Sequence, residues 1–262
     1  MIYASRSERL DWLISRLIED VPQAQGIRIP ADITDKKRLF RALMNVREPK
    51  PVTPEFLSAQ DEELQYQLEE KSVVNLDGEG IEIWQGDITR LKVDAIVNAA
   101  NSRMLGCFIP LHGCIDNAIH SAAGVQLRLE CAEVMKGQGY EEPTGMAKIT
   151  NGYNLPSKYV IHTVGPIIYG DTPNDTEQRL LADSYRNCLS LAEKQGLRSI
   201  AFCCISTGEF HFPNELAAKI AVDEVKKFMS KAQNIKHVIF NVFKDVDKDI
   251  YKKLLQQNIV SE

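Results

Sequence analysis

A chain of 262 residues has room for one large α/β domain, or for a medium-sized domain with a helical extension. With 44% hydrophobic and 26% charged residues it contains nothing near the roughly 18 consecutive apolar residues that a membrane span needs, so we exclude a membrane-embedded protein. A net charge of −5 argues against nucleic acid as a partner, because such binding relies on clustered Lys and Arg. Any phosphate ligand would therefore be held largely by backbone N–H groups.

Two further features of the composition concern the compartment. The first twenty residues interleave Arg, Glu and Asp with Leu and Ile, which is typical of an amphipathic helix and not of a signal peptide. The six cysteines are too few and too irregularly spaced for a disulfide scaffold in a chain of this length, which favours reduced thiols. We therefore expect a cytoplasmic protein.

Helical patterns dominate the first part of the chain. Residues 5–20 carry Leu and Ile at helical spacing, and Ser5-x-x-Glu8 has the form of a capping box. A second helix is expected over Lys36–Val46, and a third from Thr53-Pro54 to about Glu70. These residues suggest no chemistry of their own, so we expect 1–75 to be an N-terminal helical extension.

After residue 76 the pattern changes to short β-branched runs that alternate with helices, which is typical of an α/β layered fold. The expected strands are Ile81–Trp84, Asp94–Asn98, Ala147–Thr150, Tyr159–Thr163, Ile200–Ile205 and Val238–Phe243. The expected helices are Ile115–Lys136, Glu177–Gln195 and Asn214–Ala232. Ligands of such folds bind where loops leave the carboxyl ends of strands, here 98–114, 163–170 and 205–213.

Three segments resemble the macrodomain family: Gly86–Thr89, Val93–Asn101 and Ile205–Phe210. Thr144–Thr150 and Val160–Pro166 are also similar to strands and turns of that family, so the resemblance covers roughly residues 80–255. It implies a three-layer α/β/α fold with a central mixed sheet, and a cleft that binds ADP-ribose. We expect residues 76–262 to form this macrodomain.

The resemblance implies roles at the adenine end of the ligand. Asp87 would accept a hydrogen bond from the adenine amine, and the N–H of Ile88 would donate to the ring. The alternative for Asp87 is a turn or cap residue ahead of Ile88. Phe243 is a candidate to pack on adenine, although an aromatic residue at a strand end is more often part of the core.

The loop from Ser206 to Phe210 is the candidate phosphate site. Its residues Ser206, Thr207, Gly208 and Glu209 follow a buried strand, so successive backbone N–H groups are free to face the pyrophosphate, and Gly208 permits close approach. Phe210 would form a wall beside the distal ribose.

The loop after Asn101 departs from the Gly-rich run of many macrodomains. It places Cys107, His112 and Cys114 in a Cys-x4-His-x-Cys arrangement, and thiolates and imidazole are ligands that Zn²⁺ prefers. Three protein ligands leave one position open, which is typical of catalytic zinc, and we expect one Zn²⁺ per chain. The alternatives are buried cysteines without metal, or a closed structural site completed by Cys131 or His120.

This loop is similar to that of a microbial subgroup of macrodomains described as zinc-dependent, which also carries an N-terminal helical extension. Asp116, in the first turn of the next helix, matches the aspartate that hydrolytic macrodomains place near the scissile bond. Its alternative is a plain helix N-terminal acid. Asn101 matches the asparagine that contacts the ribose hydroxyls. The expected contacts of the distal ribose are therefore Asn101, Cys114, Ile115, Asp116 and Asn117.

The resulting hypothesis is a zinc-dependent hydrolase that removes mono-ADP-ribose from modified protein side chains, with a carboxylate ester as the expected linkage. Asp116, Asn101 and Cys114 form the expected catalytic set. One alternative is a reader that binds ADP-ribose without turnover, and another is an esterase for O-acetyl-ADP-ribose. His211 and His162 have no assigned role, the latter being interpreted as an interior histidine.

Overall fold

The computed structural model describes residues 3–170 and 172–256, and three helices open the chain. These are α1 (Arg6–Asp20), α2 (Ile33–Val46) and α3 (Pro54–Lys71), with the short 3-10 helix η1 (Pro22–Ala24) after α1. Each long helix begins at a side chain that accepts a backbone N–H of the first turn: Ser5, Asp32 and Thr53. The predicted N-terminal helices are therefore confirmed.

A six-stranded mixed sheet forms the centre of the second part, in the order β2-β8-β7-β4-β6-β5. The strands are β2 (Gly80–Gln85), β4 (Ala95–Ala99), β5 (Ala147–Asn151), β6 (Tyr159–Thr163), β7 (Ser199–Phe202) and β8 (His237–Val242). All neighbours are parallel except β5, which runs antiparallel to β6. The carboxyl ends of the parallel strands thus share one edge of the sheet.

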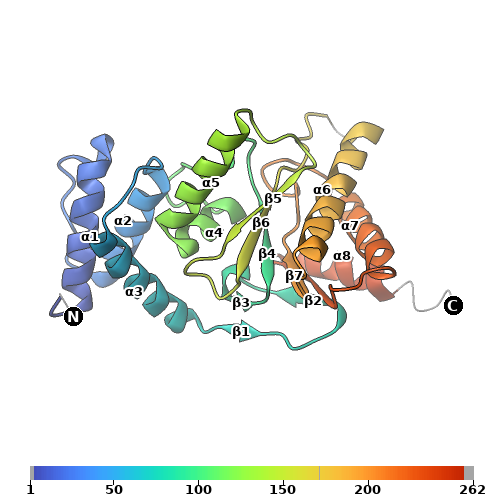
Figure 1. Cartoon of the computed structure of the whole chain (residues 1–262), viewed down its shortest axis with the longest axis horizontal. Coiled ribbons are helices and arrows are strands. Elements are labelled where there is room, and N and C mark those ends of the chain that lie inside the picture. Colours follow the sequence, from blue (N-terminus) through green and yellow to red (C-terminus); the bar gives the residue numbers. More distant parts are fainter. Residues whose placement is uncertain (1–2, 171, 257–262) are drawn as a thin grey trace.

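Helices cover the sheet on both sides (Figure 1). On one side α4 (Ile115–Ala123) contacts β4, and α5 (Val125–Gln138) contacts β5. On the other side α6 (Asp175–Lys194) contacts β5 and β6, and α8 (Asp245–Gln256) contacts β2 and β8. Between them α7 (Asn214–Met229) contacts both α6 and α8. This is the predicted three-layer α/β/α fold.

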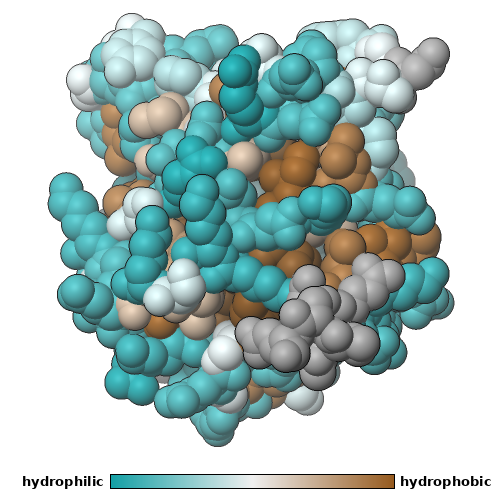
Figure 2. Space-filling model, turned by 90° about the vertical axis from the view of Figure 1, so that its right-hand side faces the viewer, coloured by the Kyte–Doolittle hydropathy of each residue, from teal (hydrophilic) through white to brown (hydrophobic). Residues whose placement is uncertain are grey.

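The outer surface of the α6–α8 side is seen in Figure 2. Hydrophilic side chains cover most of this face, and apolar side chains remain exposed between them. No helix in the described part of the chain is both long and apolar enough to cross a lipid bilayer.

Two hydrophobic clusters lie under these layers. The larger one is built from the sheet and the helices on its two faces. The smaller one is built from α1, α2 and α3, with residues such as Leu13, Phe40 and Leu43, and it takes in Val125 from α5. The division into 1–75 and 76–262 stays a prediction, which the separate clusters support.

The structure corrects several predicted boundaries. The helix expected over Ile115–Lys136 is two helices, α4 and α5, joined at Gly124. Gly124 has φ +95°, a backbone conformation that residues with a Cβ rarely adopt, so the chain turns at a position that favours glycine. The strand expected over Ile200–Ile205 ends at Phe202, where the chain enters the loop.

Other elements carried too little pattern to be predicted. The two-residue strands β1 (Val74–Asn75) and β3 (Leu91–Lys92) pair with each other, and the 3-10 helix η2 (Ile88–Arg90) precedes β3. Helix α8 was also missed, although its first turn carries Asp245 and Asp247, as helix N-termini favour.

A buried carboxylate joins α1 to α3. Glu63 has a fully buried side chain that lies 2.8 Å from Nη2 of Arg6 and 3.2 Å from Nη2 of Arg9. Because a buried ion pair that loses one partner leaves an uncompensated charge, we expect Glu63→Ala to lower the free energy of unfolding by about 3 kcal/mol.

The matched control is Glu62→Ala. Glu62 is half exposed and also pairs with Arg9, so its loss should cost less than about 1 kcal/mol. Urea denaturation measures the free energy of unfolding of both variants. If both lose the same free energy, burial does not make the ion pairs of Glu63 more important for stability than that of Glu62.

Candidate functional site

A cleft of about 1300 Å³ lies at the carboxyl ends of the parallel strands. It is lined by the segment after β2, the loop between β4 and α4, the loop after β7 and the residue after β8. Its volume exceeds the range of roughly 300–1,000 Å³ that is typical of small-molecule sites. The predicted site residues on this lining are Asp87, Ile88, Asn101, Cys107, His112, Cys114, Ile115, Asp116, Ser206, Thr207, Gly208, Glu209, Phe210 and Phe243.

Asp87 and Phe243 lie at the end of the cleft next to β2 and β8. Oδ1 of Asp87 accepts hydrogen bonds from the N–H and hydroxyl of Thr89, which makes Asp87 the N-cap of η2. Its Oδ2 accepts from Lys71 Nζ at 3.0 Å. Burial opposes ionisation, but the bonds from Thr89 and Lys71 outweigh it and lower the pKa of Asp87. The cap role is therefore present, and the carboxylate also faces the cleft.

Phe243 is 77% exposed at the end of β8. An aromatic residue of the core would be buried, so the core alternative for Phe243 is wrong. An exposed aromatic ring on a cleft lining is a typical stacking platform for a planar ligand.

The loop after β7 is a tight turn with close packing underneath. Ser206 adopts a left-handed conformation with φ +65°. A Cβ on Gly165 would lie 2.0 Å from Ser206 Oγ, so Gly165 permits the approach of the two loops. Thr207 donates its own N–H to the Cys204 carbonyl inside the turn. Among the hydrogen bonds of this turn, the backbone N–H groups of residues 208–210 donate to no acceptor in the described part of the chain.

Positively charged side chains also line the cleft, although the net charge of the chain is −5. Lys37, Arg38 and Arg41 come from α2, and Lys71 comes from α3. The N-terminal helices, expected to carry no chemistry, therefore supply the cleft with cations. Their signal in the sequence was the run of basic residues within α2, which an overall charge of −5 conceals.

Asp116 lies buried in the first turn of α4, against two amides. Its Oδ1 accepts from Asn98 Nδ2 at 2.8 Å, and its Oδ2 accepts from Asn101 Nδ2 at 3.3 Å. Burial raises the pKa of Asp116 to about 6, although both amide bonds favour the carboxylate. Sequence reasoning missed Asn98, which is fully buried in β4 and reaches Asp116 because alternate residues of the strand face α4.

His162 is the interior histidine that was expected. It is fully buried opposite Asn98 in the β4–β6 register, with Nδ1 at 3.1 Å from Asn98 Nδ2 and Nε2 at 2.9 Å from Thr150 Oγ1. Burial lowers its pKa to about 3, so the ring is neutral at physiological pH. Its contacts are consistent with a structural role beneath Asp116.

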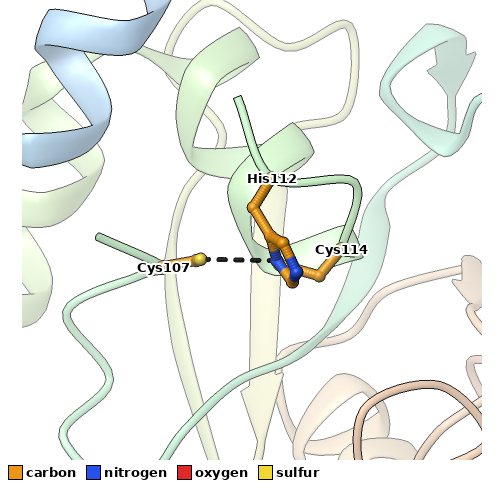
Figure 3. Close-up of side chains that lie close together, drawn as sticks. All are labelled: Cys107, His112 and Cys114. Carbon is orange, nitrogen blue, oxygen red and sulfur yellow. Dashed lines mark hydrogen bonds between the residues drawn. The ribbon is translucent and has the colours of Figure 1, made fainter. Parts of the chain in front are cut away.

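The side chains of Cys107, His112 and Cys114 lie close together in the loop between β4 and α4 (Figure 3). One ligand atom from each lies within 4.8 Å of the others, and Cys107 Sγ is 3.6 Å from His112 Nδ1. A thiolate and an imidazole on a tetrahedral Zn²⁺ lie about 3.6 Å apart by ordinary bond lengths and angles. The donor set and this spacing fit a zinc ion.

Cys114 has a second task in the fold as the N-cap of α4. Its Sγ accepts the N–H of Asn117 at 3.4 Å. Burial, with a smaller effect of the neighbouring Cys107 and Asp116, raises the pKa of the Cys114 thiol to about 12. The other ring nitrogen of His112, Nε2, lies 3.7 Å from Glu209 Oε1. The loop after β7 therefore lies next to the loop that carries Cys107, His112 and Cys114, which we call the metal loop.

The fourth ligand of a closed zinc site would have been Cys131 or His120. Both lie instead in a separate buried group with His162, whose ligand atoms are also within 4.8 Å of one another. Within the described residues neither belongs to the group of Cys107, His112 and Cys114. The three-ligand arrangement is therefore the one that the structure offers.

Asn117 departs from its expected place beside the ligand, since it is fully buried and does not line the cleft. Its Nδ2 donates to the Ile109 carbonyl at 2.9 Å, and its Oδ1 accepts from Arg41 at 2.8 Å. One turn of helix from Cys114, the side chain points into the metal loop and not toward the cleft.

Comparisons with known proteins indicate one family. The family model of the Macro domain matches residues 97–221. A protein-ADP-ribose hydrolase of Treponema medium is 50% identical over 96% of this chain and 99% of its own length. A protein-ADP-ribose hydrolase of Staphylococcus aureus (strain MRSA252) is 47% identical over 97% of each chain.

Solved structures extend the likeness to the fold. The Oceanobacillus iheyensis macrodomain with ADP is 40% identical, with a TM-score of 0.64 over 72% of this chain and 96% of that one. The Trypanosoma brucei macrodomain in complex with ADP-ribose is 32% identical, with a TM-score of 0.63 over 79% of this chain and 92% of that one. With its fold, its cleft and relatives matched over nearly their whole length, this chain belongs to the macrodomain family.

Proposed function

We propose that this protein is a zinc-dependent hydrolase that removes mono-ADP-ribose from modified protein side chains. The observation that carries the proposal is the placement of Cys107, His112 and Cys114 in the same cleft as Asp116 and Asn101. A metal-ligand set and a buried carboxylate together are the components of a hydrolytic centre, whereas a reader needs only the binding surfaces.

The relatives support the substrate class. Those from Treponema medium and Staphylococcus aureus are named protein-ADP-ribose hydrolases, and the resemblance to them includes the N-terminal helices. The solved macrodomains were obtained with ADP and with ADP-ribose. For this chain we propose ADP-ribose joined to protein, with carboxylates of Asp or Glu as the linked side chains.

The substrate would be bound along the cleft from adenine to distal ribose. Asp87 and the N–H of Ile88 are proposed to hold adenine, with Phe243 packed on the ring. The loop from Ser206 to Phe210 would hold the pyrophosphate, and Arg41 or Lys71 would add positive charge nearby. Binding energy from these remote contacts places the reacting bond beside Asp116.

The donor set described above would hold one Zn²⁺ through Cys107, His112 and Cys114. When bound, the ion supplies a Lewis acid and a template at its open coordination position. Two thiolates balance its charge, which suits a site beside an anionic ligand. The remaining chemistry is assigned to groups of the chain.

Asp116 is the proposed acid–base residue. Asn98 and Asn101 both donate to it, so their amides fix the position of the carboxylate at the cleft lining. In hydrolysis water adds across the bond from the anomeric carbon to the side-chain oxygen, giving hydroxyl to the sugar and a proton to the carboxylate. Asp116 would orient that water or accept its proton, while Asn101 contacts the ribose.

Metal removal is the first test. Chelation or Cys114→Ala should lower the release of ADP-ribose from a modified protein by more than about 100-fold, since Lewis-acid stabilisation is worth several kcal/mol. Elemental analysis should find one zinc per chain, and added zinc should restore the chelated protein. Cys188→Ala, which alters a buried cysteine of α6, is the matched control and should keep both zinc and turnover.

The same assay separates the alternatives. Undiminished release by metal-free protein would rule out catalytic zinc. Binding of ADP-ribose with no release at any zinc content would identify a reader. Turnover of O-acetyl-ADP-ribose with none of a modified protein would identify the small-ester hydrolase.

Loss of the carboxylate is a second test. We expect Asp116→Asn to lower kcat by about 10²- to 10⁴-fold, the usual contribution of acid–base catalysis, while ADP-ribose still binds. Asp183→Asn, on the exposed side of α6, is the control and should leave kcat unchanged. A wild-type kcat in Asp116→Asn would reassign Asp116 to a structural helix N-terminus.

A third test concerns adenine. Phe243→Ala should raise the Kd for ADP-ribose by about tenfold, because stacking of a base on an aromatic ring is worth about 1–3 kcal/mol. Calorimetric titration measures the change. Tyr140→Ala removes an aromatic ring that is 65% exposed outside the cleft lining, and should not alter Kd. An unchanged Kd in Phe243→Ala would show that adenine does not bind at the end of β8.

A further inference from the structure

The end of α2 contacts the loop that carries the metal ligands. Leu111, next to His112, adopts a left-handed conformation with φ +56°, which is strained for a non-glycine residue. Its N–H donates to Asn45 Oδ1 at 3.0 Å. Asn45 belongs to α2 and is 1% exposed, so its side chain is held in place by the surrounding packing. A strained residue of the loop is thus held from outside the macrodomain fold.

The other end of the Asn45 amide is tied to α4. Asn45 Nδ2 donates to Ser121 Oγ at 2.9 Å, and Ser121 Oγ donates in turn to the Asn117 carbonyl at 2.6 Å. Both polar atoms of the Asn45 side chain are therefore occupied, which fixes the orientation of the amide. Because α4 begins at Cys114, one side chain of α2 sets the loop against the helix that carries a metal ligand.

Arg41, one turn earlier in α2, contacts the loop beside the histidine ligand. Its Nη2 donates to Asn117 Oδ1 at 2.8 Å and lies 3.4 Å from the carbonyl oxygen of His112. Asn117 relays this contact to the Ile109 carbonyl at 2.9 Å. The guanidinium therefore reaches the loop on both sides of Leu111.

Arg128 of α5 contacts the metal loop at Cys107, the first of the three proposed ligands. Its Nη1 donates to the carbonyls of Met44, Asn45 and Arg47, where the end of α2 attracts a cation. Its Nη2 lies 3.4 Å from the Cys107 carbonyl oxygen. One buried guanidinium thus ties the end of α2 to the start of the metal loop.

We infer that α2 is a positioning element of the metal site, with Asn45 as its main positioning residue and Arg41 as a second. The inference rests on the proposed zinc site and adds a task for the N-terminal extension. Without α2 the loop would lose its contacts near each ligand and would sample many arrangements. Zinc binding would then have to order the loop, and the free energy needed for this ordering would weaken the zinc affinity.

Zinc affinity of the full chain tests this directly, measured by competition with a chromogenic chelator and without any substrate. Residues that support metal ligands from outside typically contribute 10- to 100-fold, so we expect Asn45→Ala to weaken zinc binding by about that factor. Arg41→Ala, at a position of intermediate burial, should weaken it in the same direction. Asn45→Asp keeps an acceptor for the Leu111 N–H and should bind zinc more tightly than Asn45→Ala.

The matched control is Gln60→Ala. Gln60 of α3 is equally buried and accepts the Val125 N–H at 2.9 Å, so it joins the extension to α5 away from the metal loop. Its loss should lower the melting temperature but leave zinc affinity unchanged. Wild-type affinity in both Asn45→Ala and Arg41→Ala would overturn the inference. A wild-type chain that binds no zinc would instead overturn the proposed function on which it rests.

Discussion

A single buried guanidinium connects the N-terminal extension, helix α5 and the metal loop. Arg128 lies in α5 of the macrodomain, donates to three carbonyls at the end of α2, and lies 3.4 Å from the carbonyl oxygen of Cys107. Burial lowers its pKa to about 10, and the charge of Asp116 partly compensates. Because a buried cation needs acceptors around it, α5, the end of α2 and the loop that begins at Cys107 are held in one arrangement.

That arrangement explains how one cleft contains parts from distant segments. Parallel strands place their carboxyl ends along one edge, so the segment after β2 and the loops after β4 and β7 meet there. Packing of α2 and α3 on α4 then adds a wall of the cleft that carries Lys37, Arg41 and Lys71. The macrodomain provides the concave surface, and the extension provides much of its positive charge.

Sequence patterns predicted the features that depend on neighbours along the chain. The N-terminal helices were recognisable from apolar spacing and capping residues, and Cys107, His112 and Cys114 from their spacing in one loop. Features that depend on distant contacts were not recognisable. The helix expected over Ile115–Lys136 breaks at Gly124, where Gln60 of α3 accepts the N–H of Val125, and the Asn117 side chain accepts a hydrogen bond from Arg41 of α2.

By itself the sequence determined the α/β class, the family resemblance and many of the residues between Asp87 and Phe210 that line the cleft, because local spacing and residue chemistry encode these. Only the tertiary structure decided that Asn98 reaches Asp116, that Phe243 is exposed, and that α2 contacts the metal loop. Asn45 and Leu111 are separated by more than sixty positions, and no local pattern reports a hydrogen bond between them. Such contacts arise when packing of the layers brings separate segments together.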